Sequence, residues 1–150
     1  MNRITLSSSE VFQGAMIGVM RRVRNIKAAR VERRAAIDIK AADGWVRDIE
    51  GALGEVALAK ALNVFIADHG DMKCPDVGDV DVRMTMHENG RLIIHPDDPD
   101  DRAFYLVTGA YGDYVVRGWI RGGDAKRDEW WTDPSGGRPA YFVPQDALTP

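Results

Sequence analysis

The sequence predicts a single α/β domain that begins with a helical segment, because the spacing of its apolar residues changes near residue 62. Before that point apolar residues recur at steps of three and four, which is the spacing of one face of an α-helix. After it they alternate with polar residues in short runs separated by Gly, Pro, Asn and Asp, as in β-strands and turns. A mass of 16.6 kDa with 45% hydrophobic residues is enough for one core. We expect one domain over residues 1–150, with a basic helical segment at 1–44 and the α/β core and C-terminal tail at 45–150.

The first expected helix begins at a capping box. Ser7 and Glu10 have the spacing at which a hydroxyl and a carboxylate each satisfy a backbone N–H at a helix start. Behind them a row of apolar residues shares one helix face, while arginines occupy much of the other. The row is Phe12, Met16, Val19, Val23 and Ile26. The pattern predicts one amphipathic helix of about five turns.

A second helix is expected from about residue 45 to 62. Residues 28–42 are helix-prone but less periodic, and the pair Asp43-Gly44 interrupts them as a C-cap or as the N-cap of the next element. Glu55 lies inside the apolar arc of the second helix, whereas Glu50 falls on the opposite strip. A carboxylate inside an apolar arc costs several kcal/mol unless it is paired, protonated or bound to a metal. Glu55 is therefore a candidate functional residue.

Most of the chain after residue 80 has the sequence pattern of β-strands and turns. Residues 80–85 and 91–95 flank a turn that contains Asn89-Gly90, which predicts a β-hairpin. Residues 96–101 are rich in Asp and Pro and predict a loop, followed by two further strands at 103–108 and 114–120. A short helix is expected within 124–131, and a short strand at 140–143.

Charge is unevenly divided along the chain, whose net charge is −3 at pH 7. Residues 1–60 hold 11 Lys and Arg against 7 Asp and Glu, whereas residues 61–150 hold 9 against 16. Cations repeated along a helix can follow a phosphate backbone, so nucleic acid is an expected partner. The expected contact residues are Arg21, Arg22, Arg24, Lys27 and Arg30. The alternative, that they form only a solvent-exposed face, stays open.

The composition narrows the possible cofactors and the expected compartment. The single cysteine, Cys74, excludes an internal disulfide and Cys-based zinc sites, and the three histidines have no metal-ligand spacing. A metal would have to be held by carboxylates, which favours Mg²⁺. No apolar run is long enough to span a membrane and no signal peptide is visible, so we expect a cytoplasmic protein without a membrane partner.

Three short motifs follow one another: a glycine-rich helical segment with a glutamate, a Pro-Asp pair, and an Asp-x-Arg strand. They are Gly51-Ala52-Leu53-Gly54-Glu55-Val56-Ala57, Pro75-Asp76 and Asp81-Val82-Arg83. In this order they resemble the PD-(D/E)xK nuclease superfamily. The helical segment is most similar to the G-x-x-G-E-x-A stretch of Holliday-junction-resolvase-like small nucleases. The resemblance covers about residues 45–120 and implies a restriction-endonuclease-like fold, a mixed β-sheet flanked by helices.

The implied activity is a Mg²⁺- or Mn²⁺-dependent deoxyribonuclease of resolvase-like type, acting in phage or prophage DNA processing. Glu55, Asp76 and Asp81 would hold the metal, and Arg83 would steady the phosphate or the attacking water. Metal held by two or three carboxylates neutralises the scissile phosphate and generates hydroxide near neutral pH. Asp81 and Arg83 are two residues apart in a strand, so their side chains share one face. A resolvase role also implies a homodimer, because two symmetric strands are cut.

The chain departs from the family pattern in two ways. Arg83 stands where the family has Lys, and a guanidinium can stabilise charge but is poorly suited to proton transfer. Only four residues separate Asp76 from Asp81, which is shorter than usual, and Asp79 is the alternative first acidic ligand.

Other interpretations remain open at this stage. Glu55 could be paired with a Lys or Arg, and the aspartates could lie in a loop and on an edge strand. The functional alternatives are a nuclease-like scaffold that has lost catalysis and binds DNA or protein, and a phage assembly protein whose basic helix docks onto an acidic partner.

Overall fold

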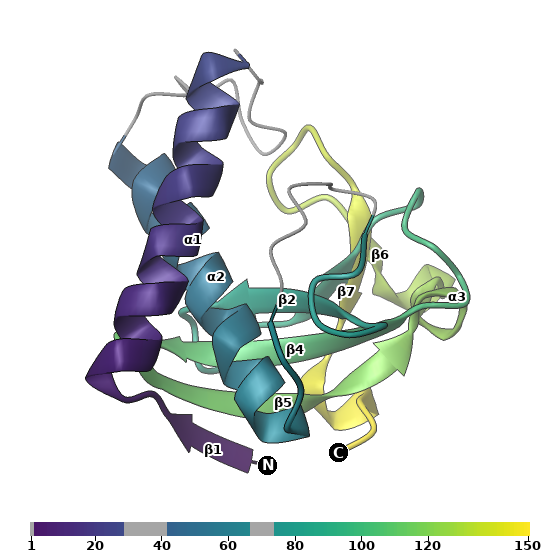
Figure 1. Ribbon diagram of the computed structural model, residues 1–150. Coiled ribbons are helices and arrows are strands. Elements are labelled where there is room, and N and C mark those ends of the chain that lie inside the picture. The colour runs from purple at the N-terminus through teal and green to yellow at the C-terminus, as the bar shows by residue number, and fades with distance from the viewer. Residues whose placement is uncertain (1, 29–41, 67–73) are drawn as a thin grey trace.

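The computed structural model describes residues 2–28, 42–66 and 74–150, and it confirms a mixed α/β fold. Helix α2 (Ala42–Leu62) packs on a four-stranded sheet, and α1 (Ser8–Lys27) packs along α2 (Figure 1). The sheet has the order β1-β5-β4-β2 and the second sheet has the order β3-β7-β6. The strands are β1 (Asn2–Thr5), β2 (Asp81–Thr85), β3 (Leu92–Ile94), β4 (Ala103–Ala110), β5 (Asp113–Arg121), β6 (Trp131–Thr132) and β7 (Ala140–Val143). Short helices are α3 (Gly122–Ala125), η1 (Asp128–Trp130) and η2 (Gln145–Ala147).

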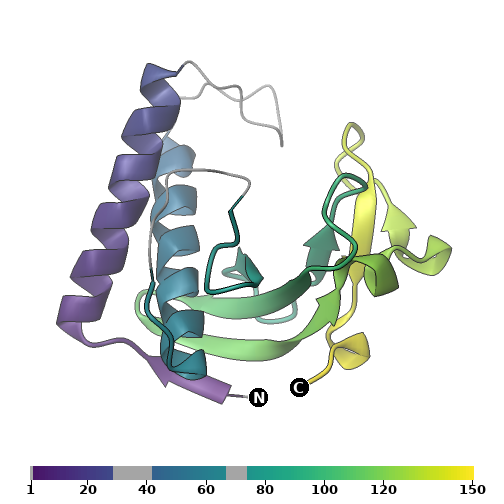
Figure 2. The ribbon, with the colours of Figure 1, turned by 45° about the vertical axis from the view of Figure 1, so that its right-hand side comes forward.

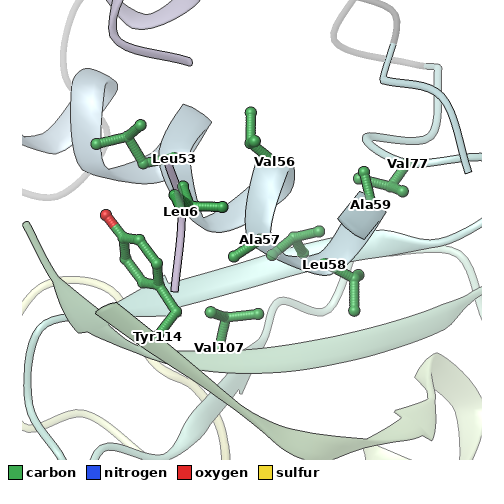
Figure 3. Packing of buried hydrophobic residues seen from close by; sticks show 10 residues of the cluster. Leu6, Leu53, Val56, Ala57, Leu58, Ala59, Val77, Val107 and Tyr114 are labelled. Atoms are coloured by element: carbon green, nitrogen blue, oxygen red, sulfur yellow. The ribbon is translucent and has the colours of Figure 1, made fainter. Parts of the chain in front are cut away.

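The first core lies between α2 and the four-stranded sheet. Figure 3 shows Ala57 and Leu58 of α2 above Val107 of β4 and Tyr114 of β5. These four side chains are at most 1% exposed, so this interface excludes water. Burial at about 25 cal/mol per Å² of apolar surface makes this contact the main anchor of α2, and with it of Glu55.

A second core lies between the two sheets. Phe104 and Leu106 of β4 point away from α2, toward Leu92 and Ile94 of β3 and Val143 of β7. Figure 2 shows the second sheet standing at the far end of the four-stranded sheet from the two long helices. Both faces of β4 are therefore covered.

The face of α1 that packs against the rest of the molecule is not its apolar face. The capping box of Ser7 and Glu10 is confirmed. The face that meets α2, however, carries Gly14, Gly18 and the buried Arg22. A Cβ atom on Gly18 would overlap the backbone of Asp48 and Ile49, so glycine is what lets the two helix backbones approach this closely. The apolar row of α1 points away from α2 instead.

The predicted hairpin of residues 80–95 is wrong. Gly90 N–H does close a turn onto the His87 carbonyl at 2.9 Å, but the strands on either side enter different sheets. Strand β2 pairs in parallel with β4, and β3 pairs antiparallel with β7. The physical reason is that Leu92 and Ile94 are completely buried in the second core. If β3 paired with the edge strand β2 in a hairpin, these two side chains would not reach that core.

Most of the other expected elements are confirmed. Strands β4, β5 and β7 lie where the sequence predicts them. Helix α2 ends at Leu62 as expected but begins at Ala42, so Asp43-Gly44 lies in its first turn and does not interrupt it. The short helix expected within 124–131 is divided among α3, η1 and β6. Strand β1 was not predicted, because only Ile4 among its four residues is apolar. The helix-prone residues 29–41 lie outside the described residues.

Candidate functional site

Glu55 is buried between the two long helices and paired with an arginine of α1. Its side chain accepts two hydrogen bonds from the Arg21 guanidinium, Nη1 to Oε1 at 2.6 Å and Nη2 to Oε2 at 2.7 Å. Glu55 is 6% exposed, so the pair is largely removed from water. Of the interpretations of Glu55 that the sequence left open, the structure shows the paired carboxylate. A two-point contact of this kind also fixes the register of α1 on α2.

Asp76 caps the free edge of β2. A bridge between Val77 and Val80, with Gly78 at φ +59°, folds the chain back so that Val82 N–H donates to Asp76 Oδ2 at 2.8 Å. Burial raises the pKa of the Asp76 carboxyl above its usual value, and the negative charge of Asp81 raises it further. The Val82 hydrogen bond, followed by the charges of Arg83 and Arg21, lowers the pKa in part. Asp76 thus lies within electrostatic reach of both strand residues of the predicted motif.

Asp81 and Arg83 project from one face of β2, as their spacing predicts, and each is held by the loop before β4. Arg102 Nη1 donates to both carboxylate oxygens of Asp81 at 3.3 and 3.2 Å. Arg83 Nη2 donates to both oxygens of Asp98 at 2.9 Å, and Arg83 Nε donates to the Ile93 carbonyl at 3.1 Å. The Arg83 guanidinium also lies 4.9 Å from the centroid of the Phe104 ring, a cation–π contact.

The predicted site residues lie on the two opposite faces of the edge strand β2 and at its edge. Val82 and Met84 pack against α2, so Asp81 and Arg83, which alternate with them, lie on the opposite face. Glu55 is on the α2 side. Asp76 stands at the strand edge between the two faces, and it interacts with charges on both. The structure therefore brings Asp76, Asp81 and Arg83 together, whereas Glu55 lies on the other face, where Arg21 pairs with it and also interacts with the charge of Asp76.

The donor chemistry of these residues fits Mg²⁺, because carboxylate oxygens are the hard ligands that this ion takes. In the structure, however, the charges of two of these carboxylates are neutralised by arginines: Arg21 pairs with Glu55, and Arg102 pairs with Asp81. Across residues 2–28, 42–66 and 74–150, no group of three or more His, Cys, Asp or Glu is positioned to hold a metal ion. A metal shared by the predicted carboxylates would have to displace these guanidinium groups.

Comparisons with protein-family models, with curated proteins and with solved structures found no significant match. The function of the chain therefore has to be argued from its own residues. One further property is shown directly: within the described part of the chain, no helix has the length and apolar character needed to cross a membrane.

The structure places the expected nucleic-acid-binding residues in different environments. Arg22 is 1% exposed and donates from Nε to Asp48 Oδ2 at 2.8 Å, with its guanidinium packed on Gly44, so it serves the α1–α2 contact. Arg21 is bound to Glu55. Arg24 and Lys27 are exposed at the C-terminal end of α1. Arg30 lies outside the described residues.

Asp79, the alternative first acidic ligand, is exposed in the turn that the Val77–Val80 bridge closes. Its place in this turn, rather than at the strand edge, favours Asp76 as the carboxylate that accompanies Asp81.

A cavity of about 510 Å³ lies between the first half of α2 and the end of β2. Its lining includes Arg47, Glu50, Glu55, Val82, Met84 and His87. Glu50 is 6% exposed, in contrast to the sequence expectation, because α2 is covered by α1 on one side and by the sheet on the other. The Tyr114 hydroxyl donates to Glu50 Oε2 at 2.6 Å and the Tyr111 N–H donates to Oε1 at 3.2 Å, which satisfies this carboxylate.

Sequence reasoning missed the partners of the candidate residues. Asp98 lies in the acidic, proline-containing segment 96–101 that the composition predicts as a loop, and Arg102 follows it directly. Nothing in this sequence indicates that the two residues bind side chains of β2. Arg21 was expected to contact nucleic acid. The one available signal was the position of Glu55 within an apolar arc, which already required a partner.

Proposed function

We propose that this chain is a metal-dependent deoxyribonuclease of the PD-(D/E)xK type with a restriction-endonuclease-like fold. The observation that carries the proposal is the half-buried carboxylate of Asp76, which accepts a hydrogen bond from Val82 N–H and interacts with the charge of a second carboxylate, Asp81. Burying like charges together weakens folding, and such placements concentrate at functional sites. The order of the motifs around Glu55, Asp76 and Asp81 supports the same conclusion.

In this proposal Asp76 and Asp81 would hold Mg²⁺ or Mn²⁺ after Arg102 releases Asp81. Glu55, which lies on the α2 side of the strand, would remain paired with Arg21. The bound ion would polarise the scissile phosphate and lower the pKa of a water molecule. Arg83, fixed by Asp98, would neutralise a phosphate oxygen and remain charged throughout. Because Arg83 is a poor proton acceptor, a carboxylate of the site would have to accept the proton of the attacking water.

The proposed substrate is DNA, with branched DNA as the first choice because of the resolvase-like helical motif. Arg24 and Lys27, at the exposed end of α1, would add non-specific affinity for the phosphate backbone. A role in phage or prophage DNA processing, and a cytoplasmic location, belong to the same proposal.

The test is cleavage of linear, nicked and four-way-junction DNA by the purified chain with Mg²⁺ or Mn²⁺, and with EDTA as the metal-free control. We expect cleavage that Asp76→Asn and Asp81→Asn each reduce by about 100-fold or more, which corresponds to about 2.7 kcal/mol or more of transition-state stabilisation. The matched control is Asp79→Asn, an exposed neighbour that should retain activity.

Two outcomes would contradict the proposal or change its residues. No cleavage of any of the three DNA forms would contradict the nuclease proposal. Loss of activity in Asp79→Asn but not in Asp76→Asn would move the first ligand to Asp79.

A second candidate function is a nuclease-like module that binds DNA or protein without cleaving it. The observation that favours it is that Arg83 makes structural contacts with Asp98, with the Ile93 carbonyl and with the Phe104 ring. Arg83→Lys separates the two candidates. A gain of cleavage would identify a decayed nuclease. In an active wild-type chain the same change should lower stability, because the single nitrogen of Lys cannot replace both Nη2, which contacts Asp98, and Nε, which contacts the Ile93 carbonyl.

A further inference from the structure

The most unusual surface of the molecule is the outer face of α1. Five large apolar side chains form a row on it: Phe12 is 66% exposed, Met16 51%, Val19 38%, Met20 49% and Val23 37%. The opposite face of the same helix is the one that packs on α2 through Gly14 and Gly18. A contiguous apolar row of this kind marks an interaction surface rather than scattered exposure.

The spacing of the row fits another helix as its partner. From Phe12 to Val23 the steps are four, three and four residues, and Ile26 continues the row after another three. This is the a/d repeat of a coiled-coil seam, narrower than the stripe with which a helix covers a domain core. The seam extends over about two heptads.

The row is also symmetric about a point between Ile17 and Gly18. If a second copy of α1 is laid against it in the antiparallel direction, each a position meets a d position, so that Phe12 meets Val23 and Met16 meets Val19. Self-complementarity of this kind is what a two-fold interface between identical chains requires.

The charges of α1 also favour the antiparallel direction. The exposed cations Arg24 and Lys27 lie in its last turns, whereas the first turn carries Glu10. Parallel helices would set both basic ends side by side. In the antiparallel pair these ends are separated by most of the helix length, about 30 Å for 20 residues, well beyond the Debye length of about 8 Å at physiological salt.

We infer that α1 is the two-fold interface of a homodimer, in which the exposed apolar row packs antiparallel against the same row of a second copy. The inference does not depend on the proposed nuclease activity. Two heptads bury less than the roughly 800 Å² per partner of a standard interface, so the dimer should be reversible, with a Kd of about 1–100 µM.

The first experiment is sedimentation equilibrium of the full chain over about 1 to 300 µM, a range that spans the expected Kd. We expect a concentration-dependent monomer–dimer equilibrium. The double variant Met16→Glu/Val23→Glu should weaken it by on the order of 100-fold, because four carboxylates would be buried in each dimer. The matched control is Phe65→Glu/Tyr111→Glu, which changes two other highly exposed apolar residues and should leave the equilibrium unchanged.

The second experiment determines the direction of packing by disulfide cross-linking in a Cys74→Ser background. A mixture of Phe12→Cys and Val23→Cys chains should form the mixed disulfide under mild oxidation, because these residues share a layer of the antiparallel pair. Neither variant should cross-link to its own copy, since the two copies of residue 12, like those of residue 23, would be about 17 Å apart. Cross-linking of each variant to its own copy without the mixed disulfide would overturn the antiparallel arrangement. A wild-type chain that stays monomeric at about 300 µM would overturn the homodimer and leave the row to a different partner.

Discussion

Arg21 of α1 and Glu55 of α2 are joined by two hydrogen bonds of 2.6 and 2.7 Å, next to the close approach of the two helices at Gly14 and Gly18. The contact gives each residue a role different from the first expectation: the arginine was predicted to bind nucleic acid, and the carboxylate was predicted to bind metal. Because the pair is mostly buried, neither partner can be removed without leaving a charge in a poorly solvated position.

Arg21→Gln should lower the free energy of unfolding by about 1–3 kcal/mol. The reason is that Glu55 would remain buried without its cation, while the 27% exposure of the Arg21 side chain keeps the loss below that of a fully buried pair. Urea unfolding followed by circular dichroism measures the change. Lys27→Gln, an exposed cation of the same helix, should change stability by no more than about 0.5 kcal/mol. Equal effects of the two substitutions would show that the Arg21–Glu55 contact contributes little.

Gly18→Ala should destabilise the chain by about 1–3 kcal/mol, because the added methyl group overlaps the α2 backbone at Asp48 and Ile49 and forces the helices apart. Gly51→Ala is the matched control inside α2. No atom lies within 4 Å of the position that its Cβ would occupy, so helix propensity should make this variant up to about 1 kcal/mol more stable. Thermal unfolding of both variants tests the pair. A stabilising Gly18→Ala would contradict the close packing of α1 on α2.

Asp76→Asn should raise the stability of the folded chain at neutral pH while removing the proposed activity. The folded-state pKa of Asp76 is raised above the ordinary 3.8, so the ionised carboxylate opposes folding above that pKa. Asparagine keeps an acceptor for Val82 N–H and carries no charge. The gain relative to wild type should be complete above the raised pKa and disappear as the pH falls below 3.8.

Melting curves of wild type and Asp76→Asn between about pH 3 and pH 8 measure this difference. A variant that is less stable than wild type at pH 7 would show that the Asp76 charge supports the fold and would weaken its assignment as a functional carboxylate.

Glu10 makes the opposite contribution to the pH dependence. The hydrogen bond from Lys60, followed by those from Ser7, lowers the pKa of Glu10 from 4.5 to about 2. Its stabilising effect should therefore be complete above pH 4.5 and be lost as the pH falls through about 2. Urea titrations of wild type and Glu10→Gln at several pH values should show a difference that closes over this interval. A difference that persists unchanged at the acidic end would contradict the lowered pKa.

The sequence by itself determined what local chemistry decides. The Ser7–Glu10 capping box, both long helices and the strands β4, β5 and β7 follow from hydrogen bonding and periodicity within a few residues. The burial of Glu55 also follows, because its neighbours along the helix are apolar. The shared face of Asp81 and Arg83 needs only the alternation of a strand.

The tertiary structure decided every relationship that depends on which element covers which face. It set α1 on α2 through Gly14, Gly18 and the Arg21–Glu55 pair and left the apolar row outside. It sent β3 to the second sheet because Leu92 and Ile94 are buried only there. It also placed Glu55 and Asp81 on opposite faces of β2, each beside an arginine that is distant in sequence. Periodicity identifies the face on which a residue lies, but the partner of that face depends on long-range packing, which no local pattern encodes.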